Sequence, residues 1–69
     1  MITPHHMQQA LQAAIAGSMY MTSKHEFADP QIICAAGLTN FVNAVLTNDP
    51  QATVADVRNA LLTYVRSQP

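Results

Sequence analysis

Charge is what this sequence has least of. Three basic and four acidic side chains make up 10% of its 69 residues, against about 25% in a typical domain. The formal net charge of -1 gives copies of the chain little mutual repulsion, so a surface of this composition is adhesive. Three basic side chains are also too few for the phosphate contacts of a nucleic-acid site, and we expect no nucleic-acid partner.

Cysteine and glycine are nearly absent as well. Cys34 is the only cysteine, which excludes a disulfide within one chain and suits a reducing compartment. The two glycines are isolated and form no phosphate-binding loop. His5 and His6 are neighbours whose side chains diverge by about 100° on a helix, so we expect exposed polar residues and neither a metal nor a cofactor.

The beginning of the chain lacks a basic start followed by an apolar run. It therefore predicts no signal peptide and a cytoplasmic location. Sixty-nine residues are enough for one domain, which we assign to 1–69, and a domain this small buries only about 60% of its unfolded surface. Without disulfides or metals, its reinforcement must come from good helix packing or from self-association.

Three segments have the apolar spacing of helices, and we expect an all-α fold with helices at about 4–24, 30–47 and 54–67. Thr3-Pro4 and Asp29-Pro30 each combine an N-cap residue with a proline suited to the first turn. Thr53-Val54-Ala55-Asp56 is a capping-box variant that opens the third segment. Gly17-Ser18 weakens the first helix and permits close approach of another helix.

The central segment is apolar around nearly its whole circumference and carries no charge between Asp29 and Asp49. Its polar side chains form one narrow stripe: Thr39, Asn40, Asn43 and Thr47. Such a helix is normally buried on nearly all sides, and two neighbours in one chain can hardly cover it. We therefore expect a second chain to cover the rest. Two asparagines, a length of about 17 residues and the lack of a basic flank argue against a membrane span.

An enzymatic alternative needs two or more of His25, Glu26, Asp29 and Cys34 to converge in a cleft. His25 and Glu26 are sequence neighbours in a connector, which favours a solvated loop. Cys34 lies among isoleucines and alanines, which predicts core packing rather than a nucleophile. We expect no catalytic activity.

The sequence thus predicts a small three-helix bundle or an intertwined helical oligomer, with the second helix as its hub. Its predicted role is a non-enzymatic protein-interaction module that acts as a homo-oligomer and binds a second protein partner: an adaptor, a small chaperone-like subunit or an inhibitor. The predicted interface residues are Met7, Leu11, Met19, Tyr20, Ile33, Leu38, Phe41, Val42 and Tyr64. An alternative is a small-ligand site for a nucleotide-like molecule between chains, contacted by Tyr20, Lys24 and His25.

Overall fold

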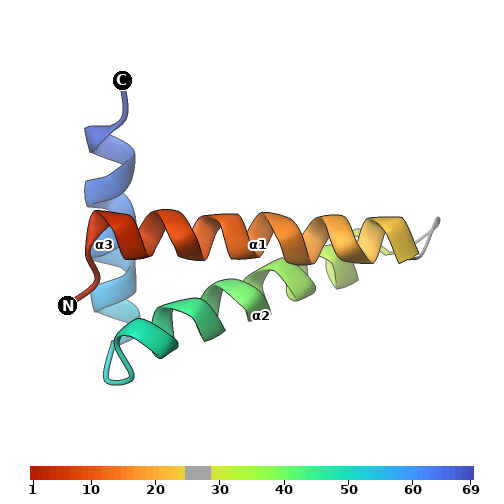
Figure 1. Ribbon diagram of the computed structural model, residues 1–69, viewed down its shortest axis with the longest axis horizontal. Coiled ribbons are helices and arrows are strands. Elements are labelled where there is room, and N and C mark those ends of the chain that lie inside the picture. Colours follow the sequence, from red (N-terminus) through yellow and green to blue (C-terminus); the bar gives the residue numbers. More distant parts are fainter. Residues whose placement is uncertain (25–28) are drawn as a thin grey trace.

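The protein is a small all-α three-helix bundle, seen in a computed structural model that describes residues 1–24 and 29–69 (Figure 1). The helices are α1 (Pro4–Lys24), α2 (Pro30–Asn48) and α3 (Val54–Ser67). The three helices expected from the sequence are confirmed, and α2 ends one residue later than expected.

Each helix begins where the sequence predicts it. The Thr3 hydroxyl accepts a hydrogen bond from the His6 amide at 3.1 Å. The Asp29 carboxylate accepts one from the Gln31 amide at 2.8 Å. These bonds satisfy amides at the helix starts that have no partner within the helix, and so they fix where α1 and α2 begin.

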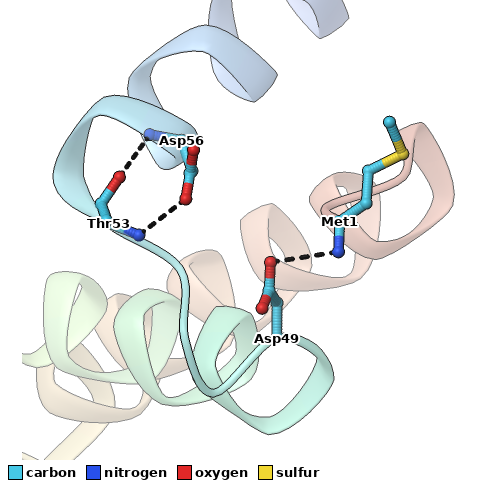
Figure 2. A network of polar contacts seen from close by, with 4 residues as sticks. All are labelled: Met1, Asp49, Thr53 and Asp56. Atoms are coloured by element: carbon cyan, nitrogen blue, oxygen red, sulfur yellow. Dashed lines mark hydrogen bonds and ion pairs between the residues drawn. The ribbon is translucent and has the colours of Figure 1, made fainter.

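A reciprocal capping box opens α3 (Figure 2). The Asp56 amide donates to the Thr53 hydroxyl at 3.1 Å, and the Thr53 amide donates to the Asp56 carboxylate at 3.0 Å. These hydrogen bonds lower the pKa of Asp56, the bond from the Thr53 backbone most of all. The carboxylate also lies at the positive end of the α3 dipole.

Helices α1 and α2 form an antiparallel hairpin that opens toward its left end in Figure 1. Two buried glycines let the helices touch: a Cβ built on Gly37 would lie 2.9 Å from the Ala14 carbonyl oxygen, and one on Gly17 would lie 3.0 Å from the Ala36 carbonyl oxygen. The close approach that the sequence suggested at Gly17 is therefore present, and Gly37 is its counterpart on α2.

Two polar side chains tie the hairpin together. The Ser18 hydroxyl donates to the Ile33 carbonyl oxygen at 3.2 Å. The Asn40 amide donates to the Ala13 carbonyl oxygen at 3.2 Å. Both acceptors are backbone oxygens of the facing helix, so the two bonds fix the register of α1 against α2.

Helix α3 crosses α1 and continues beyond it (Figure 1). The N-terminal ammonium of Met1 lies 3.2 Å from an Asp49 carboxylate oxygen, which joins the start of the chain to the turn before α3 (Figure 2). Within one chain α1 packs against both other helices, whereas α2 makes few contacts with α3. The central role expected of the second helix therefore does not describe the packing inside one chain, because α3 crosses the hairpin on the α1 side.

The core of the chain is very small. Among the described residues its buried hydrophobic side chains are Met7, Ala10 and Val45. Met7 is fully buried, so its assignment to a partner interface is corrected: it fills the core under α1 and offers no surface to another chain. The backbone extends over 37 × 30 × 16 Å. Its radius of gyration is 12.9 Å, against about 11 Å for a compact domain of this length.

Candidate interaction surface

Large hydrophobic side chains lie on the surface of all three helices. Ten of those in the described part of the chain are at least 40% exposed: Met1, Ile15, Met19, Tyr20, Ile32, Leu38, Val42, Leu46, Val54 and Val65. Scattered apolar residues are normal on a protein surface, whereas a contiguous patch marks an interaction site. The arrangement of these side chains therefore decides their meaning.

Part of the exposed set gathers around a hollow of about 850 Å³. The hollow lies between α1 and α2, and Leu61 borders it from α3. Its other lining residues are Leu11, Ala14, Ile15, Ser18, Met19, Gln31, Cys34, Ala35, Gly37, Leu38 and Phe41. None of them is charged.

A second hollow of about 400 Å³ continues the first between α2 and α3. Leu38 and Phe41 line both hollows, so the two hollows form one continuous feature, called here the apolar groove. The remaining residues of the second part are Val42, Val45, Leu46, Ala52, Thr53, Val54, Val57 and Arg58. Arg58 is the one charged side chain among the residues lining the groove, so the electrostatic potential of the groove offers little selectivity for a charged ligand.

Five of the residues predicted to form an interface line this groove: Leu11, Met19, Leu38, Phe41 and Val42. The other three accessible candidates lie elsewhere. Ile33 is half-buried against α1, Tyr64 is half-buried on α3, and Tyr20 lines a separate hollow of about 500 Å³. The structure thus brings the groove together from all three helices, and the tyrosines stand outside it.

Cys34 corrects the sequence interpretation. It was expected in the core because its neighbours are isoleucines and alanines, but it is exposed and lines the groove. The reason is that the hollow between α1 and α2 is open beside Cys34, so no helix packs over this side chain. The α3 residues of the groove were missed as interface residues, because an amphipathic helix gives no sign of how much of its apolar face its own chain will cover.

The histidine pair at the start of α1 is less exposed than expected. His6 is half-buried, its Nδ1 is buried with no hydrogen-bond partner, and the His5 and His6 ring centroids are 6.2 Å apart. Across residues 1–24 and 29–69, no three His, Cys, Asp or Glu side chains lie close enough together to hold a metal ion.

The enzymatic and small-ligand alternatives depend in part on the connector after α1. His25 and Glu26 lie outside the described residues, and so does the side chain of Lys24. Of the remaining candidates, Asp29 is engaged in capping α2 and Cys34 lines the groove. The hollow beside Tyr20 is lined by neutral side chains only.

Helix α2 is long and apolar enough to cross a membrane by length and composition, and 11% of its most apolar stretch is buried. Core helices and signal sequences share these properties, so they assign no location by themselves. The chain matches no protein-family model, no curated protein and no solved structure.

Proposed function

We propose that this protein is a non-enzymatic interaction module of the cytoplasm that assembles with further copies of itself through the apolar groove. A surface of this kind suits an adaptor, a small chaperone-like subunit or an inhibitor that covers part of another protein. The observation that carries the proposal is the amount of surface that one chain leaves uncovered.

The surface that one chain exposes in excess of a compact monomer is close to the area that each partner buries in a dimer interface. One chain exposes 5162 Å², whereas a compact monomer of 7.5 kDa exposes about 4,250 Å². The excess is therefore about 900 Å² per chain, close to the roughly 800 Å² that each partner buries in an interface of standard size.

The chemistry of the groove also favours a second copy as its occupant. Its lining is neutral apart from Arg58, which is exposed, so the only like charges that two identical grooves bring together are the two Arg58 side chains. The net charge of -1 adds little long-range repulsion between copies. A strongly charged partner would find no charged side chain there except Arg58.

Sedimentation velocity over a series from about 1 to several hundred micromolar tests the proposal directly. We expect a concentration-dependent rise from monomer to dimer or a larger oligomer, with no added partner. A single monomeric species over the whole series would overturn the proposal, because the uncovered apolar area would then be tolerated in water.

A membrane is the competing occupant of the same apolar side chains, and flotation with phosphatidylcholine and phosphatidylglycerol vesicles separates the two. We expect the protein to stay with the soluble fraction as an oligomer. Flotation of a protein that is monomeric without vesicles would assign α2 and the groove to lipid and would also overturn the proposal.

A further inference from the structure

The apolar groove is a hollow, and a hollow in a symmetric interface has to be filled by a ridge. This inference rests on self-association as proposed above and names the part of the second copy that enters the groove. We propose that α3 of each copy lies in the apolar groove of the other, so that the two copies are related by a twofold axis.

The ridge is an apolar row along α3 formed by Val54, Val57, Leu61 and Val65. Their spacing of three, four and four residues places them on one face of the helix. The first three already line the groove of their own chain, which fixes the direction in which this face points. The two ends of the row remain open, since Val54 is 87% exposed and Val65 is 59% exposed.

The ridge forms one edge of the groove and does not fill it. Leu61 borders the wider part of the groove, while the rest of that part is lined by α1 and α2. The end of α3 continues past α1, clear of the hairpin (Figure 1). In a twofold interface the same patch serves both partners, so a ridge next to a hollow is self-complementary when the axis passes between them.

The apolar row is short enough to lie within the groove. The groove follows α2 from Gln31 to Leu46, which is about 22 Å at the helical rise, and the apolar row from Val54 to Val65 is about 16 Å long. The row carries no charged side chain, so burying it leaves no charge without a partner.

Val65→Cys tests this placement by using the native Cys34 as its reporter. Cys34 lies near the start of α2, and residue 65 lies near the end of α3, at the opposite end of the molecule (Figure 1). A disulfide between them can therefore form only between two chains. Both sites are exposed, so the substitution leaves the core intact.

Thr63→Cys is the matched control, because residue 63 is exposed but lies on the opposite face of α3. At a concentration where sedimentation shows dimer, copper phenanthroline should cross-link Val65→Cys at least tenfold faster than Thr63→Cys. The wild type, which has Cys34 alone, should cross-link as slowly as the control. Circular dichroism checks that all three proteins keep the same helix content.

The outcomes separate this inference from the proposed function. Equal cross-linking of the two variants, or fast Cys34–Cys34 cross-linking in the wild type, from proteins that do dimerise would refute the placement of α3 and leave self-association standing. Monomers in sedimentation would overturn both.

Discussion

Leu38 is the side chain whose loss should most clearly separate assembly from folding. It is 63% exposed in one chain and lines both parts of the apolar groove. Leu38→Ala removes three carbon atoms from the centre of the proposed interface. In the isolated chain the same atoms already face water for the most part, so their removal should cost the monomer no more than about 1 kcal/mol.

The size of the effect follows from the exposed fraction. Three carbons contribute about 2.4 kcal/mol when fully buried, and the 63% that association would newly cover amounts to about 1.5 kcal/mol per copy. A twofold interface contains the residue twice, so dimerisation should weaken by about 3 kcal/mol, or about 150-fold in the dissociation constant.

Ile32→Ala is the matched control, because Ile32 lies on the same helix, is 52% exposed and does not line the groove. Sedimentation equilibrium measures the dissociation constants of the two variants, and urea unfolding at low concentration compares their stabilities. We expect Leu38→Ala to be the weaker dimer by at least tenfold, with unfolding of both close to wild type. Equal association of the two variants would show that Leu38 does not lie in the interface.

Four further measurements concern the scaffold. Gly37→Ala places a Cβ 2.9 Å from the Ala14 carbonyl oxygen. The overpacking costs about 1–3 kcal/mol, which outweighs a gain of about 1 kcal/mol in helix propensity. Urea unfolding should therefore show a free energy of unfolding that is lower by up to about 2 kcal/mol. Thr53→Ala removes the N-cap of α3 and should cost about 1 kcal/mol by the same assay. Folding lowers the pKa of Asp56, so the ionised carboxylate stabilises the fold above the ordinary carboxyl range. This stabilisation is lost as the pH falls through the folded-state pKa. The thermal midpoint of the wild type should therefore drop in acid, and that of Asp56→Asn should drop less. Asp49→Asn breaks the ion pair with the N-terminal ammonium and should cost under about 1 kcal/mol, with a smaller difference from wild type at high salt.

Each of these expectations has a contradicting result. A Gly37→Ala protein more stable than wild type would mean that the two helices can separate at no cost. Unchanged unfolding of Thr53→Ala would show that α3 needs no cap, and an Asp56→Asn protein with the wild-type acid response would assign that response to other carboxyls. An Asp49→Asn effect independent of salt would point to a role of Asp49 other than ion pairing.

The helices could be predicted from the sequence because their signals are local. Thr3, Asp29 and Thr53 each cap a helix through an amide two or three residues away, so the chemistry of a few neighbours sets where the helix begins. The apolar spacing then identifies the three segments. The low charge predicts a surface that associates, and this prediction is one that sedimentation can test. None of these inferences requires knowing where any helix lies relative to another.

Only the tertiary structure decided which apolar residues are covered. The contact of Gly37 with Ala14 and the crossing of α3 over α1 place Met7 in the core and leave Cys34 and Leu38 in an open groove. All three residues are hydrophobic members of a helix, and residue type alone cannot rank them. Burial depends on which face of each helix meets another helix, and that is set by contacts between residues far apart in the chain.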